Sequence, residues 1–191
     1  LLVFFSDNGA TGPGSNGGLY GKKGTLWEGG HRVPAIAWWP GQIAPGTATD
    51  ELAMTMDLMP TMVELSGSAL PLGHHLDGIS LAGLLLKGGS LEERRVFWKY
   101  REAFAMREGP WKLVWEGGAP QQQGSEYHNW VPEDDGRAGL ALFNIHDDVA
   151  ESTNMDDQYP ERVADMQAAV KSWSYDVSVG ATVQPVKSPK R

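Results

Sequence analysis

The stretch Leu1-Leu2-Val3-Phe4-Phe5-Ser6-Asp7-Asn8-Gly9 decides the fold of this chain. Its apolar run of five residues ends at a turn signal, which is typical of a strand buried on both faces. Strands of this kind occur in parallel sheets that helices cover on both sides. The pattern therefore predicts an α/β fold.

Such a strand needs neighbours, and the sequence offers one later segment of similar character, residues 33–39, with Pro34 near its start. A parallel partner is reached through a crossover of a dozen or more residues. Because a single additional strand cannot complete a covered parallel sheet, we expect the chain to be the C-terminal part of a longer protein.

The composition excludes several classes of protein. Among the 191 residues, 16 are Lys or Arg and 24 are Asp or Glu, and the resulting net charge of −8 argues against a nucleic-acid partner. No apolar run approaches the ~20 residues that a membrane-spanning helix needs. The chain has no cysteine, so a metal ion here would be bound by oxygen or imidazole.

Periodicity predicts the remaining elements. Glycine dominates residues 9–30, which predicts a long irregular loop, and Asp57 is expected to cap a helix over 57–66. A helix beginning at Pro160 should use Val163, Met166, Val170 and Trp173 to cover a sheet. A short helix is expected at 81–86, and strands are expected at 96–100, 104–107, 111–115 and 140–145.

These elements predict three parts. Residues 1–92 are expected to belong to an α/β domain, and residues 93–176 to form a small α+β subdomain in which an antiparallel sheet packs with a C-terminal helix. Residues 177–191 are expected to be a loosely ordered tail, and the polar stretch 117–139 a long excursion of similar character.

Asp7 and Asn8 stand where a buried strand meets the glycine-rich loop, the position at which open α/β sheets bind ligands. A carboxylate and an amide carbonyl offer hard oxygens that suit Ca²⁺ or Mg²⁺, although either ion takes more ligands than this pair provides. The alternative is a plain turn, because Asp, Asn and Gly are also common turn residues.

Lys23 lies between a second lysine and a glycine in the same loop. If the loop starts and ends at adjacent strand tips, its ammonium can point back toward Asp7 and Asn8 as a charge for anionic oxygens. The alternative is a solvated surface lysine.

A series of motifs in this order resembles the sulfatase family, of the arylsulfatase type within the alkaline phosphatase superfamily. The resemblance runs through about residues 1–175 and rests on the following motifs: Ser6-Asp7-Asn8-Gly9, Lys23-Gly24-Thr25, Trp27-Glu28-Gly29-Gly30-His31-Arg32-Val33-Pro34, Trp39-Pro40-Gly41, Asp57-Leu58-Met59-Pro60-Thr61, Asp77-Gly78-Ile79-Ser80-Leu81, Trp111-Lys112-Leu113 and Leu142-Phe143-Asn144-Ile145.

The resemblance implies the C-terminal part of an alkaline-phosphatase-like α/β sandwich. It implies that Asp7 and Asn8 bind a divalent cation, Ca²⁺ rather than Mg²⁺, and that Lys23 binds the sulfate of a sulfate-ester substrate. Lys22 is the less favoured candidate, because the motif's lysine directly precedes Gly-Thr. The substrate would be an aryl sulfate or a sulfated glycan, and the compartment periplasmic, secreted or lysosomal.

The family's nucleophile is a formylglycine made from Cys or Ser in a Cys/Ser-x-Pro-x-Arg motif, and this sequence contains no such motif. We therefore expect the chain to contribute cation and sulfate binding and to be inactive alone. The alternatives are a phosphoester or phosphonate hydrolase of the same superfamily, a non-catalytic pseudo-enzyme, and a glycan-binding segment.

Other polar and aromatic residues receive structural interpretations. Glu28 and Arg32 are expected to hold the loop together, and the loop histidines His31, His74 and His75 are left outside the site. The acidic turn of Asp147, Asp148 and Glu151 is expected to be solvated. Most tryptophans are expected to pack in the core, with a sugar platform of Trp111, Trp115 and Trp130 as the alternative.

Overall fold

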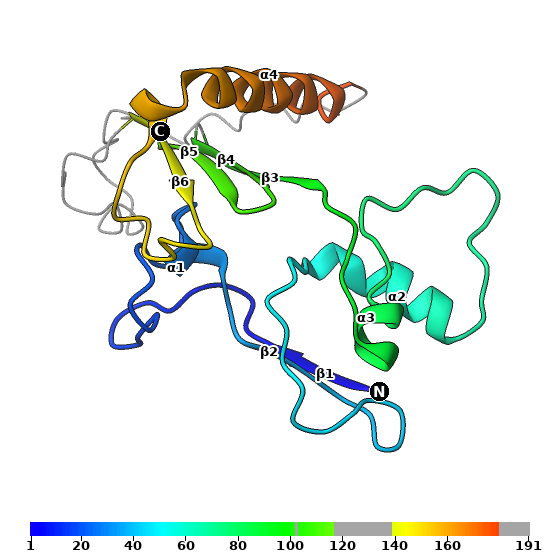
Figure 1. Ribbon diagram of the computed structural model, residues 1–191. Helices are drawn as coiled ribbons and strands as arrows, with labels where there is room; N and C mark the ends of the chain where they lie inside the picture. Colours follow the sequence, from blue (N-terminus) through cyan, green and yellow to red (C-terminus); the bar gives the residue numbers. More distant parts are fainter. Residues whose placement is uncertain (102, 117–138, 180–191) are drawn as a thin grey trace, which may run out of the picture. The chain divides into compact units, whose positions relative to one another are not determined.

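The computed structural model describes residues 1–101, 103–116 and 139–179 (Figure 1). The chain forms two compact units: residues 1–6 with 34–93, and residues 7–33 with 94–191. The glycine-rich segment 7–33 therefore packs with the C-terminal part of the chain. The domain boundaries expected from the sequence stay a prediction.

The first unit contains a two-stranded ribbon of β1, Leu2–Phe5, and β2, Ala35–Trp38. The strands are antiparallel, with Leu2 opposite Trp38 and Phe5 opposite Ala35. The expected parallel pairing is therefore wrong: the run of apolar residues identifies a strand, but the direction in which the intervening segment returns decides its pairing.

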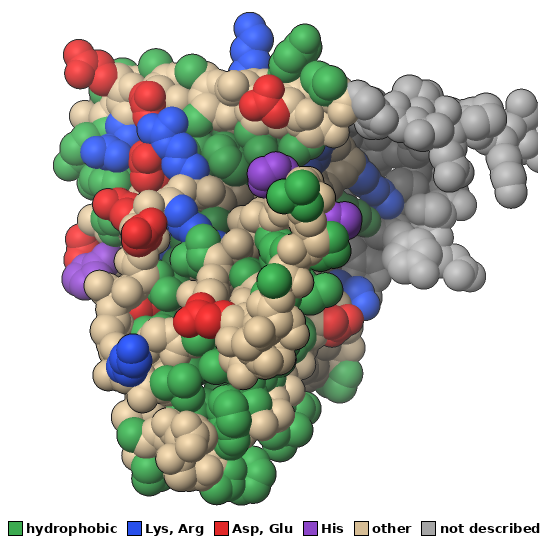
Figure 2. Space-filling model, turned by 90° about the vertical axis from the view of Figure 1, so that its right-hand side faces the viewer, with side chains coloured by type: hydrophobic (Ala, Val, Ile, Leu, Met, Phe, Trp, Pro, Cys, Tyr) green, Lys and Arg blue, Asp and Glu red, His purple; other side chains and the backbone are tan. Residues whose placement is uncertain are grey.

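The expected burial of this ribbon on both faces is also wrong for the described residues. Two directly opposed pairs share one face, and their side chains keep large exposed fractions: Leu2 59%, Trp38 61%, Phe4 66% and Ile36 62%. Figure 2 shows hydrophobic side chains at the surface in the lower part of the view, the level at which β1 and β2 lie in Figure 1. An apolar face of this kind is typical of a surface that another segment covers.

The helices of the first unit are α2, Leu58–Leu65, preceded by the 3₁₀ turn η1, Thr55–Asp57, and α3, Ala82–Lys87. Both expected helices are confirmed to within a residue or two. The carboxylate of Asp57 does not cap α2; its Oδ2 accepts from the Met54 N–H at 2.6 Å and its Oδ1 from the Ile79 N–H at 3.0 Å. Asp57 is fully buried, so it ties the start of α2 to the segment that leads into α3.

The second unit is built on a four-stranded antiparallel sheet in the order β3-β4-β5-β6. Its strands are β3, Arg95–Tyr100; β4, Ala103–Glu108; β5, Trp111–Glu116; and β6, Gly139–Asn144. The four strands expected from the sequence are confirmed. The excursion expected at 117–139 and the tail expected from 177 lie largely outside the described residues.

Helix α4, Pro160–Asp176, follows the 3₁₀ turn η3, Asp156–Gln158, and covers one face of this sheet. Three of its apolar residues are buried in a cluster with three residues of the strands. The cluster contains Val163, Met166, Val170, Met106, Leu113 and Leu142. The expected helix is confirmed, together with the face on which its apolar residues lie.

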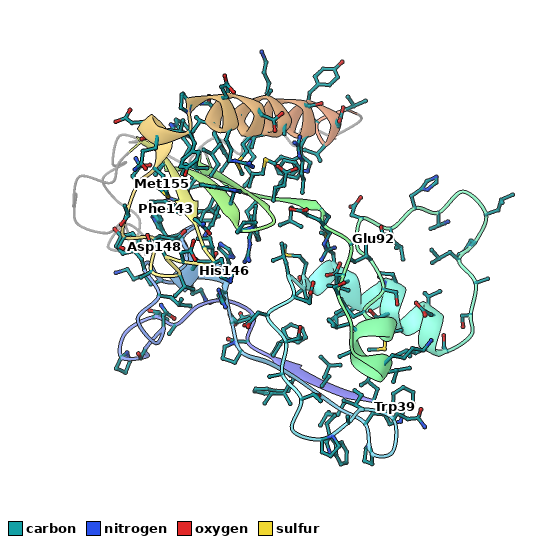
Figure 3. All side chains as sticks on the ribbon, in the orientation of Figure 1. Trp39, Glu92, Phe143, His146, Asp148 and Met155 are labelled. Carbon is teal, nitrogen blue, oxygen red and sulfur yellow. The ribbon has the colours of Figure 1, made fainter. Side chains whose placement is uncertain are left out.

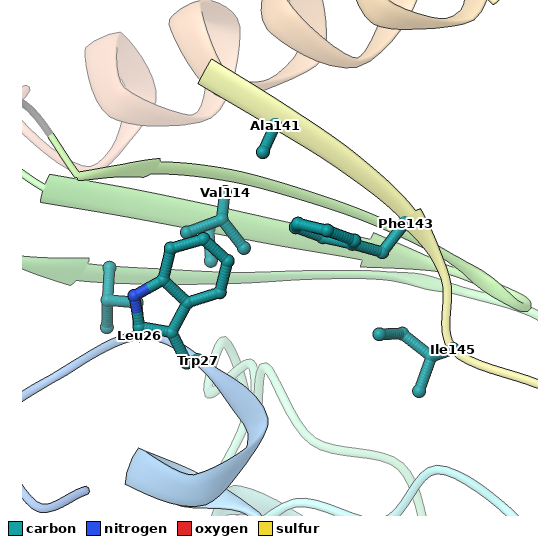
Figure 4. Close-up of a cluster of buried hydrophobic side chains, with 7 residues drawn as sticks. Leu26, Trp27, Val114, Ala141, Phe143 and Ile145 are labelled. Atoms are coloured by element: carbon teal, nitrogen blue, oxygen red, sulfur yellow. The ribbon is translucent and has the colours of Figure 1, made fainter. Parts of the chain in front are cut away.

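The opposite face of the sheet packs against the glycine-rich segment and its short helix α1, Glu28–His31. Trp27 is 2% exposed, and its indole lies against Phe143 with the ring centroids 5.6 Å apart (Figure 4). Leu26, Val114, Ala141 and Ile145 belong to the same cluster. Because neighbouring residues of a strand point to opposite faces, this alternation gives the sheet an apolar cluster on each side.

The packing of α4 can be tested at Met166, which is fully buried, with its exposed neighbour Gln167 as the matched control. Met166→Ala should lower the free energy of unfolding by about 2 to 5 kcal/mol, because it leaves a cavity between the helix and the sheet. Gln167→Ala should change it by no more than about 0.5 kcal/mol. Denaturant unfolding of the full-length gene product measures both, and equal losses would contradict the assigned packing.

Candidate functional site

The segment 7–33 folds back on itself so that its two ends lie side by side. The Gly9 N–H donates to the Gly30 carbonyl at 2.9 Å, and the Lys23 N–H donates to the Ala10 carbonyl at 3.2 Å. A Cβ on Gly9 would lie 1.7 Å from the Gly29 carbonyl oxygen, so no larger residue fits this approach. The segment was expected to be irregular throughout, and the short helix α1 near its end is a feature that the sequence analysis missed.

The structure places the three predicted site residues on this folded segment. Asp7 and Lys23 are exposed, Asn8 is half-buried, and the alternative lysine, Lys22, is half-buried. The backbone of Lys23 is bonded to Ala10, two residues beyond Asn8. The fold thus brings the backbone of Lys23 beside the segment that carries Asp7 and Asn8.

The donor chemistry of Asp7 and Asn8 fits part of a calcium site. An exposed carboxylate and an amide carbonyl supply hard oxygens, but Ca²⁺ takes six to eight of them. No group of three or more Asp, Glu, His or Cys side chains in the described part of the chain could hold a metal ion. A cation at this position would therefore need ligands beyond these residues.

A cluster of buried charged residues lies between this segment and the sheet of the second unit. The Lys112 ammonium is 2.8 Å from Oε1 of Glu28 and 2.8 Å from Oε1 of Glu151, and the side chains are 0%, 1% and 0% exposed. Oε2 of Glu151 also accepts from the Glu28 backbone N–H at 2.6 Å. One lysine of β5 therefore joins α1 to the turn that follows β6.

His31 completes the cluster. Its Nε2 lies 3.1 Å from the Lys112 ammonium, and its ring packs on Trp98 with the centroids 4.5 Å apart. Burial, with the nearby Lys112 charge, lowers the pKa of His31 from 6.5 to about 4. The ring is therefore neutral at pH 7. Its Nε2 also lies 3.1 Å from the Leu26 carbonyl oxygen, so it accepts from Lys112 in one tautomer and donates to Leu26 in the other.

The two carboxylates respond differently to the single ammonium. Burial raises the pKa of Glu151 to about 6, because it outweighs the opposing effect of Lys112. Burial also acts to raise the pKa of Glu28, but Lys112, His31 and Arg107 outweigh it and leave that pKa lowered. Glu28 is thus the more firmly ionised partner of Lys112.

Several expectations for these residues need correction. Glu151 was expected in a solvated turn and is instead completely buried, with a backbone φ of +54°. Glu28 does pair with Arg32, at 3.4 Å, as expected, but its closer partner is Lys112, 84 residues away. His31 was expected to be an unengaged loop histidine and is part of the cluster.

Of the other acidic residues of this turn, Asp147 is exposed as expected, and Asp148 is half-buried. His146 and Asp147 are exposed, and Figure 3 shows His146 and Asp148 along the turn that follows β6. Asp148 accepts from the backbone N–H groups of Ser152 and Thr153, each at 2.8 Å. These contacts shape the turn that carries Glu151 into the interior.

The sequence does contain a signal for the cluster. Strand 111–115 is apolar except for Lys112, and its alternation puts Lys112 on the same face as Val114, which is fully buried. A lysine on a buried face implies anionic partners, because an unpaired buried charge is very costly. The signal gives no indication of which carboxylates those partners are.

The tryptophans of β5 are used in packing. Trp111 contacts Tyr159, with Arg162 over its ring, and Trp115 stacks on Phe104 with the centroids 5.4 Å apart. Trp130, the third member of the alternative sugar platform, lies outside the described residues. The structure therefore supports the packing role for Trp111 and Trp115.

Comparison with known proteins agrees with the motifs on this segment. The family model described as Sulfatase matches residues 1–68. Bovine arylsulfatase A is 37% identical over 190 residues, which is 90% of this chain and 36% of that protein. Mouse N-acetylgalactosamine-6-sulfatase is 40% identical over 118 residues, which is 59% of this chain and 23% of that protein. The chain belongs to the sulfatase family.

Solved structures show the same relation. The crystal structure of Ps i-CgsB in complex with k-i-k-neocarrahexaose has a TM-score of 0.73 and 27% identity to this sulfatase-family chain, and the match covers 91% of this chain and 36% of that one. The chain thus spans about a third of the length of the relatives it matches most extensively. The expected fold class, an α/β sulfatase portion with a small antiparallel sheet, is confirmed.

The buried His31 predicts a specific pH dependence. Because its folded pKa of about 4 lies below 6.5, the unfolded chain binds more protons between these values, and the free energy of unfolding falls as the pH falls. His31→Gln should remove about 3 kcal/mol of this loss between pH 6.5 and 4. Denaturant unfolding across this range measures the difference.

Glu151 acts in the opposite sense, because its pKa of about 6 makes the folded state bind more protons between pH 4.5 and 6. It is present in both proteins, so the comparison isolates His31. An NMR titration of the His31 imidazole provides a direct check, and a midpoint near 6.5 would contradict its assigned surroundings.

Proposed function

We propose that the protein containing this chain is a sulfatase that hydrolyses sulfate esters, and that this chain binds the sulfate group and part of a cation site. The observation that carries the proposal is the arrangement of segment 7–33. It carries the family's Asp-Asn and Lys-Gly-Thr motifs and places the Lys23 backbone beside Ala10. The similarity to arylsulfatase A over 90% of the chain supports it.

Lys23 would bind the sulfate oxygens through its ammonium. Its side chain is exposed, and it is the second residue of a tight turn in which Thr25 bonds back to Lys22; Gly21, before this turn, and Gly24, within it, have positive φ values of 83° and 90°. An ammonium is a compact charge with three donors and suits an anionic group whose negative charge must be stabilised in the transition state.

Asp7 and Asn8 would provide two oxygens to a calcium ion. When bound, a divalent cation stabilises negative charge on the oxygens of a transferred group. Asn8 is half-buried, and Gly9 packs so closely against the backbone of Gly29 that it has no room for a side chain. These contacts hold this part of the loop in place. Asp7, which is exposed, is then free to turn toward a cation.

The family's formylglycine would be supplied by other residues of the protein, because this sequence has no cysteine and no serine in the required motif. In this proposal the chain alone has no turnover. None of the helices in the described part of the chain is long and apolar enough to cross a bilayer.

A sulfated carbohydrate is the substrate class that we favour. One relative is named for N-acetylgalactosamine 6-sulfate chemistry, and a structural relative of 27% identity was solved with k-i-k-neocarrahexaose. An assay of the full-length gene product on paired aryl sulfate and aryl phosphate, followed by sulfated oligosaccharides, tests the proposal. Turnover of the phosphate alone would refute it and favour the phosphoester hydrolase alternative.

The role of Lys23 can be separated from that of its neighbour. Lys23→Ala should reduce kcat/KM for an aryl sulfate by about 2 to 4 kcal/mol of transition-state stabilisation, because one charged contact to the sulfate is lost. Lys22→Ala should have a much smaller effect. Steady-state kinetics of both variants decides the assignment, and a larger loss in Lys22→Ala would transfer the role to that residue.

The role of Asp7 predicts a change in metal dependence. Asp7→Ala should weaken the binding of calcium and lower turnover, since a hard anionic ligand is lost. Asp50→Ala, at another exposed aspartate, is the control and should leave both unchanged. Titration of chelated enzyme with Ca²⁺ and with Mg²⁺ measures the effect, and an unaltered calcium requirement in Asp7→Ala would remove this residue from the site.

A further inference from the structure

Stability alone does not explain the buried cluster of Lys112, Glu28, Glu151 and His31, because apolar residues could fill the same space. Lys112 lies on a sheet face that also contains the apolar residues Ala105, Val114, Ala141 and Phe143 and, directly opposite Lys112, Arg107. Replacing a buried ion pair by well-packed apolar residues of similar size is often neutral or stabilising. The cluster therefore points to a need for defined geometry.

The geometry of Lys112 is directional. Its ammonium donates to Oε1 of Glu28 at 2.8 Å, forms an ion pair with Oε1 of Glu151 at 2.8 Å, and lies 3.1 Å from Nε2 of His31, which accepts from it in one of the two tautomers. Glu28 and His31 are the first and last residues of α1. A single rigid strand residue thus holds both ends of this short helix.

Helix α1 is in turn the common support of both site segments. Its Gly30 carbonyl accepts from the Gly9 N–H, next to Asn8. At its other end Leu26 and Trp27 are buried against the sheet, and Thr25 bonds to Lys22, next to Lys23. A displacement of α1 would consequently move Asn8 and Lys23 together.

Glu151 holds helix α1 from the turn that follows β6. Its Oε2 accepts from the Glu28 N–H at 2.6 Å, so the same carboxylate binds the lysine and the backbone at the start of α1. Each of these contacts restrains the position of α1 on the sheet.

We propose that Lys112, Glu28 and Glu151 are positioning residues, which act through α1 to hold the sulfate-binding Lys23 and the Asp7-Asn8 segment in register with each other. This proposal rests on the proposed function. The three residues are buried behind the loop, so they act without contacting the substrate.

A double-mutant cycle tests the proposal in the full-length gene product. The triple variant Glu28→Gln, Lys112→Met and Glu151→Gln keeps the side-chain volumes and removes the three buried charges together, while Arg32, which loses its carboxylate partner, is 40% exposed. The variant should lower kcat/KM for an aryl sulfate by about tenfold or more, because misplacement of about 1 Å can cost 10²-fold in rate. In the Lys23→Ala background the same triple change should cost a clearly smaller factor than in the wild type, because one of the residues that it positions is absent, and the remaining loss reports the Asp7-Asn8 segment.

A second variant applies if the triple variant fails to fold. Lys112→Arg keeps the charge, but its planar guanidinium cannot reproduce the three directions of the ammonium. It should show the same loss of kcat/KM and the same dependence on Lys23. Met166→Ala, on the opposite face of the sheet, is the control for a loss of stability alone and should leave kcat/KM unchanged at a temperature where it is folded.

The outcomes separate this proposal from the one on which it rests. If Lys23→Ala itself has wild-type kcat/KM, the assigned role of Lys23 fails. If Lys23→Ala is impaired and the cluster variants lose the same factor with or without Lys23, the positioning role fails. Wild-type kcat/KM in the cluster variants would also overturn the positioning role.

Discussion

One ammonium group, that of Lys112, joins parts of the chain that are far apart in sequence. It is completely buried and lies between Glu28 of α1 and Glu151 of the turn after β6. A buried charge is tolerated only when its partners are close and well oriented, since desolvation of an ion is expensive. The glycine-rich segment must therefore lie where Glu28 can pair with Lys112, because the lysine would otherwise be buried without one of its two carboxylates.

The sheet of the second unit packs against a different segment on each of its two faces. Its residues alternate, so one face receives the apolar residues of α4 and the other receives Leu26 and Trp27 of the glycine-rich segment. The ion cluster lies on the second face, beside an apolar cluster that excludes water from it. Packing and charge thus act on the same segment: the apolar contacts place it on the sheet, and the directional contacts orient it.

Much of this architecture could be predicted from the sequence, because local patterns set it. The strands of the second sheet and helix α4 follow directly from alternation and helical spacing. The direction of β1 relative to β2 and the burial of Glu151 could not be predicted in this way. Both depend on how distant segments meet, and neither a run of apolar residues nor an acidic turn contains that information.

The same limit applies to the candidate site. Asp7, Asn8 and Lys23 were selected because they match family motifs, and their metal and sulfate roles remain predictions. Glu28, His31 and Lys112 also lie in motifs of the resemblance, but the resemblance gives them no part in cation or sulfate binding. Lys112 was recognisable only as a charge on an apolar strand, and its two carboxylates only from the folded chain.

The long separations within the cluster have a consequence for how the protein is made. Glu28 bonds to Lys112, 84 residues later, and to Glu151, 123 residues later. Synthesis proceeds from the N-terminus, so the glycine-rich segment leaves the ribosome well before Lys112 and Glu151 exist. The buried cluster can therefore form only after β5 and the turn that follows β6 have been synthesised.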